Sequence, residues 1–283
     1  MISAQQLKDK IKNSAKGDSM KAQLLLRNYM MERFLARVAL SEYKDNFILK
    51  GGMLVSAVVG IQARTTMDID ATVRALPLRL EETKYIIEKI IAIDAGDGVT
   101  FEITKISDIM EEHDYPGIRI VLDSKLEGLK QTIKVDISTG DEITPNAIRY
   151  FYKLMFNAGE IAIWSYNLET LLAEKLETIV ARGTANTRMR DFYDIYTLWK
   201  EKEMDVNVGI LHRAFYNTAN KRDTIKQMEN IESILKEIEY SSEMKKLWLT
   251  YLQNSVYVRE LEWDKVLETV KIIFGKIIEK KEN

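Results

Sequence analysis

The sequence predicts an α/β N-terminal domain followed by an all-α C-terminal domain. All three prolines (Pro77, Pro116 and Pro145) and ten of the thirteen glycines fall before residue 165. Proline and glycine interrupt regular elements, so this distribution predicts short alternating helices and strands in the first part. From Leu168 onward the apolar residues recur almost only with helical spacing. We therefore expect two domains, residues 1–167 and 168–283.

The order of elements in the N-terminal part follows from the spacing of its apolar residues. We expect a helix at about 19–41, a strand at 47–49, a short helix at 53–62, a strand at 67–73, a helix from about 80 to 91, and strands near 99–106, 117–123 and 131–138. In the strand at 67–73, Ile69, Ala71 and Val73 alternate on one face, so Asp68 and Asp70 share the other.

The C-terminal part predicts a helical bundle. Two helices are expected at about 168–182 and 188–201, and two later stripes of apolar residues have helical spacing. The stripes are Ile225, Met228, Leu235 and Ile238, and Trp263, Val266, Val270, Ile273 and Ile277.

Composition limits the chemistry. The 283 residues are 46% hydrophobic and 30% charged, which is enough to bury a core. The net charge is -2, so any contact with nucleic acid has to be a local basic patch. The chain has no cysteine and only two histidines, which excludes disulfides, thiolate metal sites and histidine-rich centres. Metal binding would then rest on carboxylates, which favour hard ions such as Mg²⁺.

The sequence predicts a cytoplasmic protein without a membrane span. It opens without the apolar core of a signal peptide, and it has no apolar run near the roughly 18 residues that cross a bilayer. His113, in the acidic stretch EEHDYPG, is expected at the surface.

The chemistry-bearing block is LKGGMLVSAVVGIQARTTMDIDATV, residues 49–73. Gly51 and Gly52 let backbone N–H groups approach a phosphate at a helix N-terminus. Asp68 and Asp70 project side by side and can hold Mg²⁺ ions that bridge a nucleoside triphosphate. Asp136, on a later apolar strand, offers a third carboxylate whose repulsion a cation would relieve. Taken singly, the glycine pair also fits a tight turn and the aspartates an exposed strand edge.

These motifs support a family resemblance. Gly51-Gly52, the run Arg64-x-Thr66-x-Asp68-Ile69-Asp70 and Val135-Asp136 resemble the signature of polymerase β-type nucleotidyltransferases. Leu-Leu-Ala-Glu-Lys-Leu at 171–176, Arg182, and Arg-Asp-Phe-Tyr-Asp-Ile at 190–195 are similar to the later motifs of the AbiEii/AbiGii toxin family. The resemblance covers about residues 47–196.

The resemblance implies a mixed twisted sheet flanked by helices and a helical domain closing over the cleft. It also implies a bacterial toxin of a toxin–antitoxin or abortive-infection (phage defence) system, countered by an antitoxin encoded nearby. The implied reaction transfers a nucleotide from an NTP, with release of pyrophosphate, to an RNA acceptor, and the tRNA 3′ end is our first choice. The base of the NTP stays open.

The roles of individual residues follow from the same resemblance. Asp68 and Asp70 would ligate two Mg²⁺ ions, with Asp136 completing the site. The phosphates would meet the Gly51 and Gly52 amides and the side chains of Lys50, Arg64, Lys175 and Arg182. Asp191 would orient Lys175 or take part at the acceptor, whereas Asp194 is expected to be structural.

Alternatives remain for several of these residues. Lys175, Arg182, Asp191 and Asp194 also fit an interhelical salt-bridge network, because each pair shares a helix face. Arg182, Arg188 and Arg190 form either an RNA-binding patch or a solvated face. At the level of function, the alternatives are a nucleotidyltransferase acting on a protein or small molecule, which the net charge of -2 mildly favours, and a non-catalytic nucleotide-binding module.

Overall fold

The computed structural model describes residues 2–110, 116–258 and 260–279. It divides into two compact units, one formed by Met1–Asp141 with Ile148–Ser165 and one by Glu142–Ala147 with Tyr166–Asn283. The predicted domain border at 167/168 therefore misses the short segment Glu142–Ala147, which belongs to the helical unit. Thr144 explains this, because its carbonyl accepts hydrogen bonds from the Asn167 side chain (2.8 Å) and from the Thr170 hydroxyl (3.1 Å).

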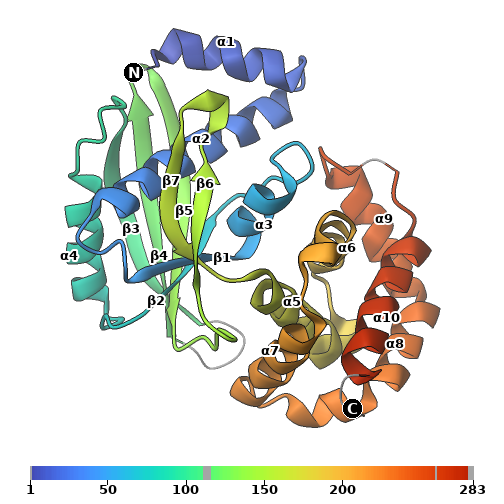
Figure 1. Ribbon diagram of the computed structural model, residues 1–283. Helices are drawn as coiled ribbons and strands as arrows, with labels where there is room; N and C mark the ends of the chain where they lie inside the picture. Colours follow the sequence, from blue (N-terminus) through green and yellow to red (C-terminus); the bar gives the residue numbers. More distant parts are fainter. Residues whose placement is uncertain (1, 111–115, 259, 280–283) are drawn as a thin grey trace. The chain divides into compact units, whose positions relative to one another are not determined.

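The first unit is built on a seven-stranded mixed sheet in the order β3-β4-β5-β2-β1-β7-β6 (Figure 1). The strands are β1 (Phe47–Lys50), β2 (Ile69–Val73), β3 (Thr100–Met110), β4 (Pro116–Leu126), β5 (Leu129–Thr139), β6 (Ile148–Lys153) and β7 (Glu160–Ser165). The central pairs β1–β7 and β2–β5 are parallel, and the other neighbours are antiparallel. The expected mixed sheet is confirmed.

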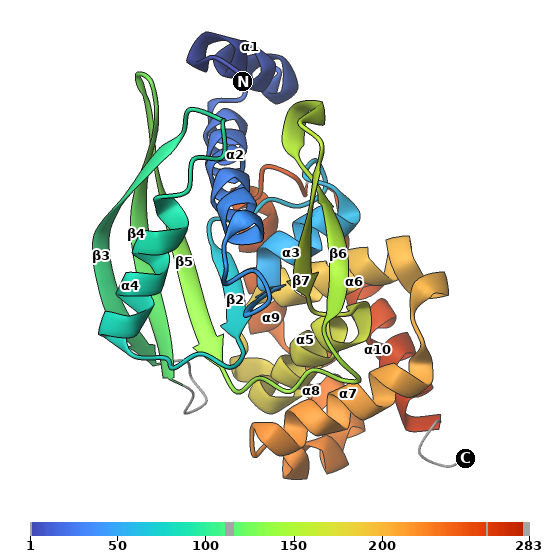
Figure 2. The ribbon, with the colours of Figure 1, turned by 60° about the vertical axis from the view of Figure 1, so that its left-hand side comes forward.

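Four helices accompany this sheet: α1 (Ala4–Ala15), α2 (Ser19–Leu40), α3 (Gly51–Val59) and α4 (Leu80–Ile91). Helix α2 lies across β5 and β7 and contacts α4, which packs on β3 (Figures 1 and 2). Helix α3 packs on β1 and β2. It begins at Gly51, the residue after the end of β1, so the chain turns from strand to helix without an intervening loop.

The second unit is all helical, as expected. Its α-helices are α5 (Leu168–Arg182), α6 (Met189–Lys202), α7 (Val208–Lys221), α8 (Ile231–Tyr240), α9 (Ser242–Asn254) and α10 (Trp263–Glu279). Asn167 caps α5 by accepting a hydrogen bond from the Thr170 amide at 2.7 Å. The predicted apolar stripes lie in the core except for Ile225, which is half-buried, and Ile238 and Ile277 are fully buried.

Differences from the predicted elements concern their ends and a few missed segments. The helix expected at 53–62 begins at Gly51, and the strands near 99–106 and 117–123 are longer. Helix α1, strands β6 and β7, and helices α7 and α9 were not predicted. Within the described residues, no helix has the length and apolar character needed to cross a membrane.

Candidate functional site

The turn between β1 and α3 is packed against Asp70 of β2. Gly51 has φ +62°, a left-handed conformation that favours glycine, and a Cβ at this position would lie 2.1 Å from Asp70 Oδ2. The Gly52 amide donates a hydrogen bond to the same oxygen at 3.2 Å. A Cβ at Gly52 would lie 2.7 Å from the Thr66 Oγ1. Both glycines are therefore required by the close approach of the turn to β2 and its preceding loop.

The sheet register brings Asp70 and Asp136 together. Strands β2 and β5 run parallel, and their register pairs Asp70 with Asp136 and Ile69 with Val135. Because side chains alternate along a strand, both carboxylates lie on the face opposite the apolar one. Asp70 and Asp136 therefore lie side by side because of the register between β2 and β5, which the sequence alone does not reveal.

Asp68 and Asp70 differ in their surroundings. The Thr66 hydroxyl donates to Asp68 Oδ1 at 3.0 Å and so orients that carboxylate at the start of β2. Burial, together with the neighbouring charges of Asp68 and Asp136, raises the pKa of Asp70 to about 7, against the opposing effects of Lys50 and of the hydrogen bond from the Gly52 amide. Like charges are therefore held close together at this end of β2.

Asp136 is held by a residue that the sequence analysis did not identify. Arg119 on β4 lies opposite Asp136 in the antiparallel register. Its Nε donates to Asp136 Oδ1 at 2.8 Å and its Nη2 to Oδ2 at 2.6 Å, which is a bidentate ion pair. Arg119 and Asp136 lie on the same face of the sheet, on neighbouring strands. The sequence does not give the register between these strands, so it could not reveal the pair.

Lys50 and Arg64, both expected at the phosphates, have protein partners. Lys50 Nζ lies 2.7 Å from Asp141 Oδ2, and the Ser138 hydroxyl donates to the same oxygen at 2.8 Å. Burial disfavours the Asp141 carboxylate, yet Lys50 and these hydrogen bonds lower its pKa overall. Arg64 is buried, donates to the Thr65 carbonyl, and has its Nη2 next to Gly52.

The donor set of this unit fits a divalent cation in chemistry and in charge. Asp68, Asp70 and Asp136 offer hard carboxylate oxygens, and burial together with the charges of Asp68 and Asp136 disfavours the Asp70 carboxylate, which a cation would stabilise. Residues 2–110, 116–258 and 260–279 contain no three His, Cys, Asp or Glu side chains already spaced around one ion. Asp68, Asp70 and Asp136 are the residues of this unit that would hold the metal.

In the second unit, Lys175 lies between two aspartates. Lys175 Nζ on α5 is 2.8 Å from Asp191 Oδ1 and 2.8 Å from Asp194 Oδ2, both on α6. All three side chains are at least 90% buried. Burial lowers the pKa of Lys175, but the two carboxylates outweigh it and raise the pKa above its usual value. The alternative of an interhelical salt-bridge network therefore describes the geometry of these residues.

Arginines surround this network. Arg188 Nε lies 2.7 Å from Asp191 Oδ2, and the Arg188 side chain is half exposed. Burial and the nearby charges of Arg188 and Arg222 lower the pKa of Arg182. Arg222 pairs with Glu174 at 3.0 Å and with Glu177 at 2.6 Å. Three arginines thus lie near one another beside α5.

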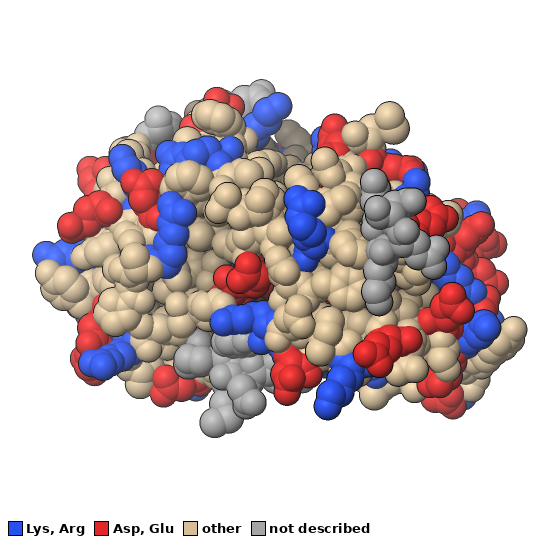
Figure 3. Space-filling view, turned by 60° about the horizontal axis from the view of Figure 1, so that its bottom comes forward, with Lys and Arg blue, Asp and Glu red and all other residues tan. Residues whose placement is uncertain are grey.

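The third member of the predicted RNA patch, Arg190, is exposed on α6. Across the surface drawn in Figure 3, lysines and arginines are interspersed with aspartates and glutamates. This mixture agrees with the balanced charge of the whole chain. His113 lies outside the described residues.

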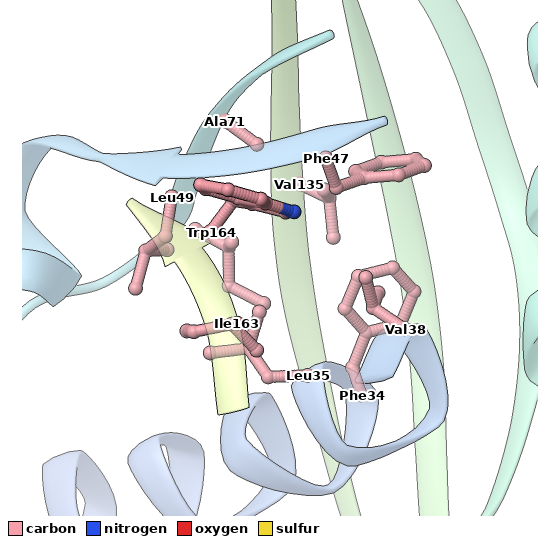
Figure 4. Close-up of a pocket in the computed structure, with 10 residues that line it drawn as sticks. Phe34, Leu35, Val38, Phe47, Leu49, Ala71, Val135, Ile163 and Trp164 are labelled. Carbon is pink, nitrogen blue, oxygen red and sulfur yellow. The ribbon is translucent and has the colours of Figure 1, made fainter. Parts of the chain in front are cut away.

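Two cavities of the first unit do not suit a nucleotide. Between α2 and the sheet, Phe34, Val38, Phe47 and Val135 lie around a void of about 10 Å³, shown in Figure 4. Such a void is no larger than one water molecule, and its lining is apolar, so it belongs to the core. A groove of about 390 Å³ near Tyr43 and Tyr85 is lined by Glu81 and Glu82, whose charges disfavour a triphosphate.

Comparison with known families decides the identity. Residues 33–269 match the family model described as "Nucleotidyl transferase AbiEii toxin, Type IV TA system". The chain belongs to the AbiEii family. It is therefore a nucleotidyltransferase of a family of type IV toxin–antitoxin toxins, as the motifs predicted. Membership implies an NTP substrate and an antitoxin partner, and this family generally uses divalent metals.

A solved structure shows the same fold. A predicted nucleotidyltransferase from H. pylori is similar with a TM-score of 0.52 and 15% identity, covering 92% of this chain and 96% of the other. JHP933 from Helicobacter pylori is also similar, with a TM-score of 0.48, 15% identity, and coverage of 92% and 95%. No curated protein matches the chain. The match to the first structure shows that this AbiEii chain has a nucleotidyltransferase fold.

Proposed function

We propose that this AbiEii protein transfers a nucleotide from an NTP to an RNA acceptor, with the 3′ end of tRNA as our first choice, and thereby arrests growth during phage infection. The observation that carries the proposal is the close apposition of the Gly51-Gly52 turn to Asp70, with Asp136 paired to Asp70 in the next strand. Because NTP and tRNA are cytoplasmic substrates, we place the reaction in the cytoplasm.

The carboxylates of the first unit are assigned to metal binding. Asp68 and Asp70 would hold two Mg²⁺ ions, with Asp136 as the third ligand. The ions, when bound, supply positive charge to the triphosphate and to the acceptor oxygen. The Thr66 hydroxyl keeps Asp68 oriented, and the Gly52 amide does the same for Asp70. These contacts reduce the reorganisation that the site needs before it binds its substrates.

The basic residues are assigned to the phosphates. In the reaction, the acceptor hydroxyl forms a bond to the α-phosphorus, the bond to pyrophosphate breaks, and the hydroxyl proton passes to solvent. Lys175, kept protonated by Asp191 and Asp194, would offset charge on the leaving pyrophosphate, with Lys50, Arg64 and Arg182 contributing to NTP binding. Asp191 would orient Lys175. Arg182, Arg188 and Arg190 would contact the RNA backbone.

The test is incubation of the purified protein with Mg²⁺, one α-³²P-labelled NTP at a time, and total cellular RNA, followed by a denaturing gel. Asp68→Asn removes one carboxylate with little change in shape, and we expect it to abolish labelling and toxicity. Asp9→Asn, in the exposed first helix, is the matched control and should leave both intact. Label in a tRNA-sized band with wild type alone supports the proposal and identifies the base.

Other results would point elsewhere. Label in protein or in small molecules instead of RNA would favour the alternative of a protein or small-molecule acceptor, which the net charge of -2 also permits. Equal labelling by wild type and Asp68→Asn would contradict the assignment of the carboxylates. Absence of label in every lane, with NTP still bound, would indicate a nucleotide-binding module without turnover.

A further inference from the structure

The charged side chains around Asp70 are unequally matched. Four carboxylates lie in this part of the first unit, those of Asp68, Asp70, Asp136 and Asp141. Two cations lie with them, since Lys50 pairs with Asp141 and Arg119 with Asp136. These two pairs leave Asp68 and Asp70 without a cation of their own among the two, and Arg64 lies nearby, beside Gly52. While no ion is bound, Arg119 supplies the positive charge that neutralises Asp136.

The two ion pairs differ in accessibility. Lys50 and Asp141 are both more than 90% buried, so their pair is part of the interior. The Arg119 side chain is 38% exposed, whereas that of Asp136 is only 12% exposed. The guanidinium of Arg119 can turn further into solvent, because an arginine with this exposure keeps its charged group hydrated as it moves. Of these two cations, Arg119 is therefore the one that can move without disturbing the core.

Resting on the proposed function, we propose that Arg119 is an internal counter-cation of the Asp68, Asp70 and Asp136 cluster. It holds Asp136 through both carboxylate oxygens while no divalent ion is bound, and it competes with the ion for that residue. Arg119 is thus a positioning residue, since it acts through Asp136 and is assigned no contact with the substrate. Its role is to set the concentration of divalent ion at which the site fills.

Two consequences follow from the geometry. Without Arg119, Asp136 would keep its place opposite Asp70 but lose its cation, so the metal-free protein should be less stable. A divalent ion would then meet three carboxylates with no positive competitor. Because the positive charges of Arg119 and of the ion repel each other at a distance of a few ångströms, removal of Arg119 should raise the affinity of the site for the ion about three- to tenfold. A merely structural ion pair predicts the first effect without the second.

The experiment measures Mn²⁺ and Mg²⁺ binding by calorimetry and thermal unfolding with and without the ion, for wild type, Arg119→Ala and Arg119→Lys. Lys125→Ala is the matched control, because Lys125 lies on the same strand in an exposed pair with Glu102 at 3.4 Å. For Arg119→Ala we expect tighter binding of the ion and a metal-free Tm about 2–4 °C lower, restored by the ion. Arg119→Lys keeps the charge without the two-pronged hydrogen bond, so it should be intermediate.

Each outcome separates the two proposals. Unchanged or weaker ion binding in Arg119→Ala would overturn the counter-cation and show that Arg119 only orients Asp136. If wild type binds no divalent ion at all, both the counter-cation and the metal-dependent reaction under "Proposed function" are wrong. If wild type binds the ion and labels RNA but Arg119→Ala matches Lys125→Ala in affinity, the reaction stands and the counter-cation falls.

Discussion

Gly51 and Asp70 are in such close contact that position 51 has no space for a side chain. A Cβ at Gly51 would lie 2.1 Å from Oδ2 and 2.6 Å from Cγ of Asp70. The same glycine has φ +62°, so it satisfies both a backbone and a packing requirement. The strand-to-helix turn and the aspartate of β2 therefore form one structural unit, and a change in the first must displace the second.

Gly51→Ala tests this contact. The positive φ alone costs about 1 kcal/mol for alanine, and the overlap with Asp70 should add about 1–3 kcal/mol. We expect a lower Tm together with loss of nucleotidyl transfer. Gly60→Ala is the control, because Gly60 also has a positive φ, +94°, but nothing lies within 4 Å of its Cβ position. Equal destabilisation by the two variants would contradict the contact, and unfolding curves in urea distinguish the cases.

Lys175→Met should destabilise the helical unit and abolish transfer. The substitution leaves Asp191 and Asp194 as buried carboxylates without the ammonium between them, which costs about 3–5 kcal/mol. Thermal unfolding measures the first effect and labelled-NTP transfer the second.

A double variant separates the fold from the chemistry of Lys175. Lys175→Met with Asp194→Asn removes one of the two buried charges, so it should regain part of the lost stability. We expect its transfer activity to stay absent, because Lys175 is assigned to the pyrophosphate. If transfer returns with stability, Lys175 has only a structural role.

Glu32 predicts a pH dependence of stability that lies outside the candidate site. Burial raises its pKa to about 7, against hydrogen bonds from the Met155 amide, Tyr152 and Asn28. Because the folded-state pKa is above the ordinary value of 4.5, its contribution is present below about pH 4.5 and is lost as pH rises through about 7. The loss is on the order of 2–3 kcal/mol.

Unfolding free energies between pH 4.5 and 8 check this sign. Glu32→Gln cannot ionise, so its stability should change less with pH than that of wild type over this range. Glu88→Gln, half exposed on α4, serves as the control and should follow wild type. A Glu32→Gln curve parallel to that of wild type would show that another group is responsible.

The sequence alone was sufficient for the elements whose signal is local. The apolar spacing predicted the helices α2, α4, α5 and α10. One face is buried in α4 and α10, whereas α2 and α5 are buried on all sides over much of their length. Strands β6 and β7 were missed, since each is only six residues long and its pairing with a neighbouring strand is not visible in the sequence. Motif spacing also placed Asp68 and Asp70 on one strand at 67–73, but β2 begins only at Ile69, so Asp68 precedes the strand and only Asp70 lies in it.

The tertiary structure decided the partners of these residues. Asp136 lies beside Asp70 because β2 and β5 are parallel in one register, and Arg119 lies beside Asp136 because β4 and β5 are antiparallel in another. A shift of either register by one residue would send these side chains to the opposite face. Alternation along each strand is written in the sequence, whereas pairing between strands depends on long-range contacts that form only when the whole sheet folds.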